Sequence, residues 1–443
     1  MSEAGASLVG EVPAEPIRRG DPSATIARAA AWSAVAILLV VVPTLAALGL
    51  IEPSSVNRMG RYLAYVLVAL GIDLIWGYTG LLSLCQALFF CLGGYAIGMF
   101  LSTAQGGGDV RPEYHDIPQF FFYNDITALP AFWRPFTSLP VAIVAGLAVP
   151  TAVAALFGWM IFRSRVRGVY FSIITQALAW AALLAFTNHH LLMGGTNGLS
   201  NFFRPLNNDR PWIIGLYLAT AVAVVAAWGF CRWLVGTRTG RVLIAVRDNE
   251  SRLRFAGFQP VAYKVFIFSV AAFLAALGGL LYTPQNGVIG PSNMSIDWHI
   301  TMVIWVAVGG RGRLWGAIVG ALAVNFAYAA MTSDLPAVWP FVQGAMFLAV
   351  VLFFPDGLVG VWDRCAALLR DGRTTRAALA IAPLAALSVA LAIEALGWWP
   401  AALQRPLPVL GIPLKYLVIV LGITAPVVAG WLQDRAVRVE AAS

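Results

Sequence analysis

Charged residues are scarce in this sequence. Only 11% of its 443 residues are Asp, Glu, Lys or Arg, whereas 60% are hydrophobic and the mean hydropathy is +0.78. A soluble globular domain carries about 25% charged residues. This composition excludes a soluble enzyme, a disordered chain and a secreted disulfide-bonded domain, and it predicts a polytopic membrane protein.

The motifs of nucleotide hydrolysis, hydrolytic catalysis and metal binding are also absent. The chain has only two lysines, Lys264 and Lys415, and neither follows a glycine as in the Gly-Lys-Ser/Thr of a P-loop. There is no Gly-x-Ser-x-Gly, and the four histidines form no His-Glu-x-x-His. The four cysteines include no Cys-x-x-Cys pair, which favours buried free thiols. We therefore expect no metal, no cofactor and no covalent chemistry.

Eleven runs of mostly apolar residues approach or reach the about 20 residues that a spanning helix needs. They cover residues 30–50, 62–82, 85–103, 139–162, 168–187, 212–235, 263–283, 314–331, 338–354, 378–400 and 415–433. A further run, 298–310, reaches only about 20 Å as a helix. If it also crosses, 21 of the 29 Lys and Arg residues lie inside and 8 outside, as the positive-inside rule requires. The sequence predicts an all-α membrane bundle with about twelve crossings and both termini cytoplasmic.

The largest inner segment between spans, 236–262, has the pattern of two short helices. Apolar residues at helical spacing within 242–246 predict the first helix, and a second follows within 253–256. Asp248 and Asn249 separate them and are good N-cap residues, while Gly257 and Pro260 end the second helix. Such a pair suits a groove on another protein. A basic loop lying on anionic lipid is the alternative, and the mixed Arg-Asp-Asn-Glu-Ser turn favours the protein partner.

Few polar side chains lie inside the predicted spans, and these are candidates for a substrate path. Asp73 is the clearest intramembrane acid, and an ion-coupled secondary carrier would use such a group. Gln86, Thr175, Gln176 and Asn325 are uncharged and would suit a small neutral solute that needs hydrogen bonds. Hydrogen bonds between helices explain each of them equally well.

Six stretches, in order within residues 30–362, carry a resemblance to a known family. They are 76–84, 165–177, 194–199, 247–257, 303–312 and 353–358, including Trp-Gly-Tyr-Thr-Gly-Leu-Leu-Ser-Leu and Arg-Asp-Asn-Glu. As a set they resemble the branched-chain amino acid/urea family of ABC importer permeases, and in particular its M-type urea permease subunit. One departure concerns 85–87, where Cys-Gln-Ala stands in place of the Gly-His-Gly that is common in the family.

The resemblance implies an assembly in the bacterial inner membrane. It comprises a second homologous permease subunit, two cytoplasmic ABC ATPase subunits and a periplasmic solute-binding protein, with no nucleic acid. The segment that docks on the ATPase corresponds here to Arg247, Asp248, Asn249, Glu250, Ser251, Arg252 and Gly257. The long outer loop 104–138 is either a docking surface for an outside partner or a solvated insertion. The resemblance covers a permease domain at 30–362, between a cytoplasmic tail, 1–29, and an accessory segment, 363–443, with two predicted membrane helices.

The function expected from the residues and the resemblance together is ATP-driven import of urea or a short amide by alternating access, with no enzymatic activity in this chain. Few charged groups are available for a zwitterion, which favours urea over a branched-chain amino acid, the alternative substrate. An ion-coupled carrier centred on Asp73 is the alternative from a second class, and a membrane-embedded enzyme is a third.

Overall fold

In the computed structural model, the residues described are 37–105, 129–166, 168–188, 192–200, 210–334, 339–353 and 357–360, with Val35, Pro118, Phe121 and Phe202 between them. Within this part of the chain, seven helices are long and apolar enough to cross a membrane. They are α3 (Pro53–Thr79), α4 (Gln86–Gln105), α5 (Leu139–Arg163), α6 (Val169–Thr187), α8 (Arg210–Gly236), α10 (Pro260–Asn286) and α12 (Leu314–Asp334). The predicted polytopic helical fold is confirmed.

Shorter elements complete the described bundle. They are the π-helix η1 (Ile37–Val41), α2 (Val42–Ala47), α9 (Arg238–Phe255), α11 (Ile296–Gly309), α13 (Trp339–Phe353) and the 3-10 helices η4 (Arg134–Thr137), η6 (Gly195–Asn197) and η7 (Pro291–Met294). The short run 298–310 forms α11, which pairs antiparallel with α12. The count of twelve crossings stays a prediction, because the tail 1–29 and the runs 378–400 and 415–433 lie outside the described residues.

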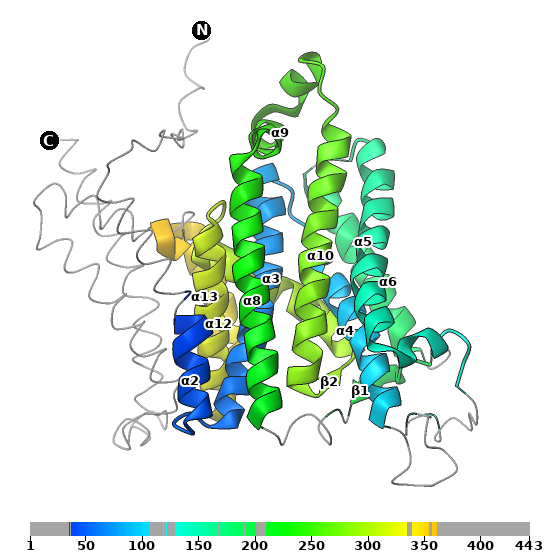
Figure 1. Ribbon diagram of the computed structural model, residues 1–443. Helices are drawn as coiled ribbons and strands as arrows, with labels where there is room; N and C mark the ends of the chain where they lie inside the picture. Colours follow the sequence, from blue (N-terminus) through cyan, green and yellow to red (C-terminus); the bar gives the residue numbers. More distant parts are fainter. Residues whose placement is uncertain are drawn as a thin grey trace, which may run out of the picture.

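The centre of the bundle is the pair α3 and α10 (Figure 1). Each has 27 residues, begins with a proline in its first turn and ends at a glycine in the left-handed conformation, Gly80 or Gly287. Proline fits the first turn because the N–H groups there have no intrahelical acceptor, and glycine adopts positive φ without strain. α10 also packs against α4 and α5. Its Gly279 lies so close to a main-chain oxygen of α4 that no Cβ would fit.

α3 begins nine residues before the apolar run that predicted it. Polar side chains in its first three turns have partners at the end of α10. Asn57 donates a hydrogen bond to the main-chain oxygen of Gln285 at 2.7 Å, and Arg61 donates to Asn286 Oδ1 at 2.9 Å. These contacts support helix where hydropathy alone gave no signal.

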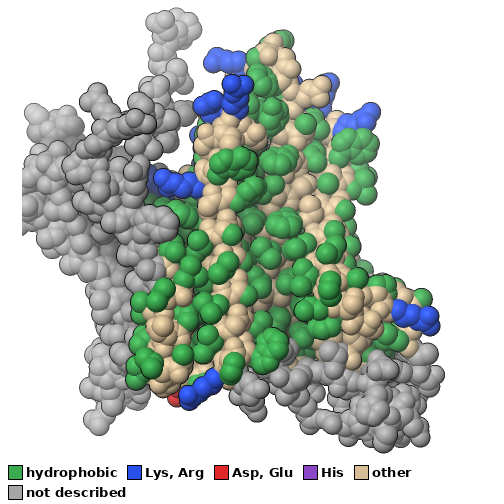
Figure 2. Space-filling model, in the orientation of Figure 1, with side chains coloured by type: hydrophobic (Ala, Val, Ile, Leu, Met, Phe, Trp, Pro, Cys, Tyr) green, Lys and Arg blue, Asp and Glu red, His purple; other side chains and the backbone are tan. Residues whose placement is uncertain are grey.

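The two ends of the bundle differ in charge and in structure. Lys and Arg side chains gather at the end where α9 lies, and hydrophobic side chains cover the face between the ends (Figure 2). At the opposite end, β1 (Leu199–Ser200) and β2 (Val288–Ile289) form a two-stranded antiparallel sheet (Figure 1). α5, α6 and α8 leave most of their residues exposed or half-buried, so their faces are available to lipid or to a partner helix.

Candidate functional site

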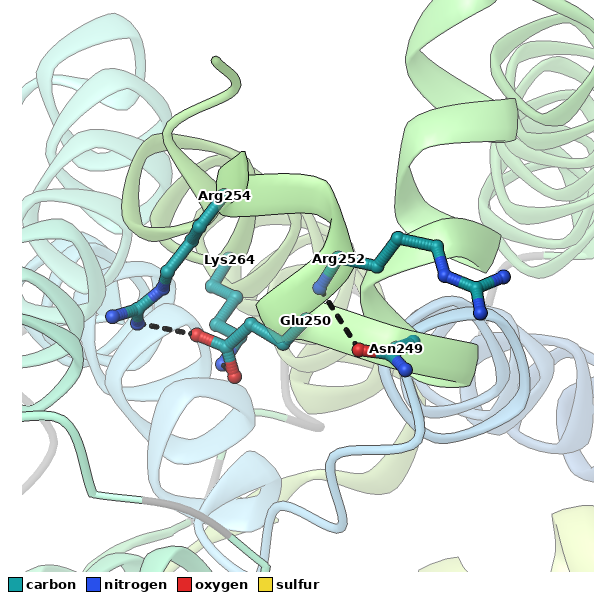
Figure 3. A network of polar contacts seen from close by, with 5 residues as sticks. All are labelled: Asn249, Glu250, Arg252, Arg254 and Lys264. Atoms are coloured by element: carbon teal, nitrogen blue, oxygen red, sulfur yellow. Dashed lines mark hydrogen bonds and ion pairs between the residues drawn. The ribbon is translucent and has the colours of Figure 1, made fainter. Parts of the chain in front are cut away.

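α9 consists of two helical segments that meet at a kink. Asn249 has φ −157° and ψ 92°, which is extended rather than helical. Its Oδ1 accepts a hydrogen bond from the Arg252 main-chain N–H at 2.9 Å (Figure 3), which is the N-cap geometry of a helix that begins at Glu250. The predicted pair of short helices with a polar turn between them is therefore confirmed.

The second segment ends where the sequence predicted. The main-chain N–H of Phe258 donates to Leu253 O at 3.3 Å, and that of Gly257 donates to Arg254 O at 3.0 Å. These two bonds with Gly257 at φ +85° form a Schellman motif. Pro260 then starts α10, so a short connection fixes the direction of α9 relative to the central helix.

Glu250 binds two cations inside the protein. Its Oε1 lies 2.6 Å from Arg254 Nη2, and its Oε2 lies 2.7 Å from Lys264 Nζ at the start of α10 (Figure 3). The side chains of Glu250 and Lys264 are only 12% and 5% exposed. The Lys264 ammonium also lies 5.8 Å from the ring centroid of Phe162 on α5. Glu250 therefore joins the second segment of α9 to α10, and most of its surface is not available to a partner.

Arg247 joins the first segment of α9 to α3. Its Nη1 donates a hydrogen bond to Gly77 O at 3.0 Å, and its Cγ contacts the Cα side of Gly80. Gly77 lies in the last turn of α3, where carbonyl groups lack intrahelical donors and the helix dipole favours a cation. Arg247 also forms an exposed ion pair with Asp248 at 3.1 Å.

The side of α9 that faces away from the bundle is exposed. Ser251, Arg252 and Gly257 from the predicted docking segment are exposed, whereas Leu253 packs inward. Phe255 is 92% exposed and Phe258 is 44% exposed. Sequence reasoning placed Phe255 with Leu253 in one apolar stretch, but their spacing of two residues puts them on different helix faces. That spacing was the available signal for an exposed aromatic residue at this surface.

The non-helical segment between α3 and α4 brings together two of the predicted path residues. Thr175 Oγ1 on α6 accepts a hydrogen bond from the Leu84 main-chain N–H at 3.1 Å. Gln86 is at the start of α4, and its Nε2 donates a hydrogen bond to Ser83 Oγ at 3.4 Å. In this segment beside α6, one buried polar atom, Gln86 Oε1, is thus left without a hydrogen-bond partner among the described residues.

The remaining predicted path residues lie elsewhere. Asp73 is fully buried on α3, and its Oδ1 accepts a hydrogen bond from the Gly312 N–H at 2.7 Å. Asn325 donates to Ala321 O at 2.7 Å and lines a cavity of about 390 Å³ between α11, α12 and α13. Gln176 is half-buried on α6. The structure therefore does not bring the five residues into a single chamber.

Cysteine and metal-ligand side chains form no site among the described residues. Cys85, Cys91 and Cys231 are buried free thiols, and no group of three His, Cys, Asp or Glu side chains is placed to hold a metal ion in that part of the chain. Cys365 lies outside the described residues. So do residues 106–128 of the outer loop 104–138, apart from Pro118 and Phe121.

Comparison with known proteins adds independent evidence. A family model described as "Branched-chain amino acid transport system / permease component" matches residues 55–351. The high-affinity branched-chain amino acid transport system permease protein LivM of Salmonella typhimurium is 23% identical over 335 residues, covering 70% of this chain and 71% of that protein. The probable branched-chain amino acid transport permease protein LivM of Methanocaldococcus jannaschii is 24% identical over 322 residues, 67% of this chain and 90% of that protein. The ribose import permease protein RbsC of Escherichia coli is 27% identical over 198 residues, covering 42% and 59%. No solved structure matches.

Proposed function

Since the chain belongs to the family of permease components of branched-chain amino acid transport systems and is a multi-pass protein of the plasma membrane, we propose that it is the solute-conducting subunit of an ATP-driven importer. The chain has no ATPase site of its own. Two cytoplasmic ABC ATPase subunits would supply the energy, a periplasmic solute-binding protein the solute, and a second homologous permease subunit the other half of the pathway. The permease unit would comprise residues 30–362, and the family match lies within it.

The observation that carries this proposal is the arrangement of α9. One side of α9 is attached to both central helices, through Arg247 to α3 and through Glu250 to α10. The other side exposes Arg252 and the almost fully exposed ring of Phe255. Burying such a ring in a partner's pocket is strongly favourable, which supports α9 as a docking surface. A partner that moves α9 would thereby move the two helices at the core of the bundle.

For the substrate we propose urea or a short amide. The charged side chains buried in the described residues are Asp73 and Lys264. Lys264 is bonded to Glu250, and Asp73 is bonded through Oδ1 to Gly312, while its Oδ2 has no partner in that part of the chain. The polar atoms near the 80–86 segment are uncharged hydroxyl and amide groups. A neutral molecule with several donors and acceptors fits such groups without a counter-ion.

A branched-chain amino acid is the second candidate substrate. The names of the LivM relatives in both organisms favour it. An ion-coupled carrier would depend on Asp73, whose Oδ1 accepts a hydrogen bond from Gly312 and whose buried Oδ2 has no partner among the described residues. The match to a permease component of ATP-driven transport systems favours the importer over this carrier.

The experiment is uptake by vesicles that contain the complete importer, with labelled urea and labelled leucine compared under the same conditions. We expect uptake to require ATP and to persist with a protonophore. Replacing the exposed ring by Phe255→Ser should reduce ATPase binding and uptake together. Tyr170→Ser is the matched control, because Tyr170 is a 74% exposed aromatic residue at the start of α6. Uptake that collapses with the protonophore would contradict the ATP-driven mechanism, and uptake of leucine alone would contradict the urea assignment.

A further inference from the structure

The carboxyl end of α3 contacts two other elements. One is α9, the coupling segment that is expected to dock on the ATPase, and the other is the turn between α11 and α12. Gly77 receives the Arg247 hydrogen bond on its carbonyl oxygen at 3.0 Å. The turn that joins α11 to α12 lies against the Cα of Gly77. It is so close that a Cβ added at Gly77 would be 2.5 Å from the Gly312 nitrogen. One turn earlier, the fully buried Asp73 holds this same nitrogen at 2.7 Å. The two contacts therefore meet within one helical turn.

α11 and α12 form a closely packed hairpin beyond this turn. Main-chain atoms of Gly309 and Gly316 lie against each other, as do those of Trp305 and Gly320, with no room for a Cβ at the glycines. Backbones in such direct contact move together, because packed interfaces transmit displacement instead of absorbing it. We therefore expect the hairpin to move as one rigid body, with the turn beside α3 at its cytoplasmic end.

The other end of the hairpin lines a cavity whose mostly apolar wall carries a few polar side chains. The cavity of about 390 Å³ is bounded there by Thr301 of α11, Asn325 of α12 and Gln343 of α13. Gln343 Nε2 donates a hydrogen bond to Thr301 Oγ1 across it. A tilt of the hairpin about its turn would change the shape of this cavity.

We propose that Asp73 and Arg247 are positioning residues of transport, which hold the α11–α12 turn and the coupling segment α9 against the same end of α3, so that displacement of α9 is passed to the hairpin. This inference rests on the proposed function, because it assumes an ATPase that moves α9. It gives the buried acid a mechanical role in place of ion coupling. A carboxylate suits that role, because charge-assisted hydrogen bonds to main-chain N–H groups are stronger than neutral ones.

The test is the number of ATP molecules hydrolysed for each solute imported by the complete, reconstituted importer. Asp73→Leu removes the acceptor of the Gly312 N–H, whereas Asp73→Asn keeps an oxygen in place. Arg247→Gln removes the contact with Gly77. We expect Asp73→Leu and Arg247→Gln to raise the ratio of ATP to solute about tenfold, within the roughly 5- to 150-fold range that is typical of coupling between two sites. Asp73→Asn should retain most of the coupling, and Arg232→Gln, an exposed change on α8 outside the coupling segment, should leave the ratio unchanged.

A role limited to folding would reduce the amount of assembled complex without changing the ratio, so copurified ATPase is measured for each variant. If Asp73→Leu fails to assemble, the ratio measured for Arg247→Gln decides the question. The Arg247 side chain lies at the cytoplasmic end of the bundle and not in its buried centre, so we expect this variant to assemble. The double variant should be no worse than either single variant, since both act on one linkage. Normal coupling in Arg247→Gln would overturn the inference while leaving the proposed function intact. Wild-type uptake that does not need ATP would instead overturn the proposed function.

Discussion

We predict that the ion pair between Glu250 and Lys264 is required to fix the position of α9. Its atoms are 2.7 Å apart, and both side chains are close to fully buried. Removing one member of a buried ion pair costs about 3–5 kcal/mol, because the other charge is left without a partner. Glu250→Gln should cost about 3 kcal/mol, at the low end of this range, since the Lys264 ammonium keeps its contact with the ring of Phe162. Lys264→Met should cost less, because Arg254 still neutralises Glu250 at 2.6 Å.

The assay has two readouts on the purified complex. Unfolding free energy, or the midpoint of thermal unfolding in one detergent, reports the loss of the bridge. Solute uptake reports the misplacement of α9. Glu250→Lys would bring three cations together and should abolish uptake while the chain still inserts into the membrane. The exchange Glu250→Lys with Lys264→Glu restores opposite charges, and we expect it to recover part of both readouts.

A double-mutant cycle measures the interaction between Glu250 and Lys264 directly. A coupling energy between Glu250 and Lys264 of about 2 kcal/mol is expected for a contact pair of this burial. Coupling near zero would refute the idea that this bridge fixes α9. Loss of uptake in Glu250→Gln with unchanged stability would also refute it, and would indicate direct contact of Glu250 with the ATPase.

Two further predictions concern the backbone. Asn249→Ala should destabilise the second segment of α9 by about 1 kcal/mol through loss of its N-cap, whereas Asn249→Asp should not, and hydrogen exchange of residues 250–256 would show the difference. Gly279→Ala should cost about 3 kcal/mol or more and reduce the folded yield, because a Cβ there meets the main chain of α4. Gly215→Ala on α8 is its control, since no atom lies within 4 Å of a Cβ at that position, and equal yields of the two variants would contradict the packing argument.

The local structure of the coupling segment was predictable because neighbouring residues determine it. Asn249 caps the helix that follows it, and Gly257 ends that helix, by hydrogen bonds that span three to five residues. The same holds for the membrane helices, whose apolar runs predict their positions to within a few residues. α3 is the exception, since its first three turns depend on Gln285 and Asn286 from a helix more than 200 residues later.

The roles of individual polar residues were not predictable in this way. Asp73 was identified as an intramembrane acid, but nothing near it in sequence indicated Gly312 as its partner. Glu250 was placed on the docking surface, whereas folding turns it toward Lys264. Asn325 and Thr175 are both predicted path residues, and the sequence did not indicate that Asn325 lines a cavity between α11, α12 and α13, apart from Thr175.

What the sequence determined by itself is the class of the molecule: a polytopic helical membrane protein with a basic, helix-forming loop between two of its membrane helices. Hydropathy, charge asymmetry and helix caps are properties of short segments, so they survive without knowledge of the fold. Only the tertiary structure decided how that loop is attached, with Arg247 on α3 and Glu250 on α10. The physical reason is that a hydrogen bond or ion pair needs two groups within about 3 Å. Packing of helices that are distant in sequence sets that separation.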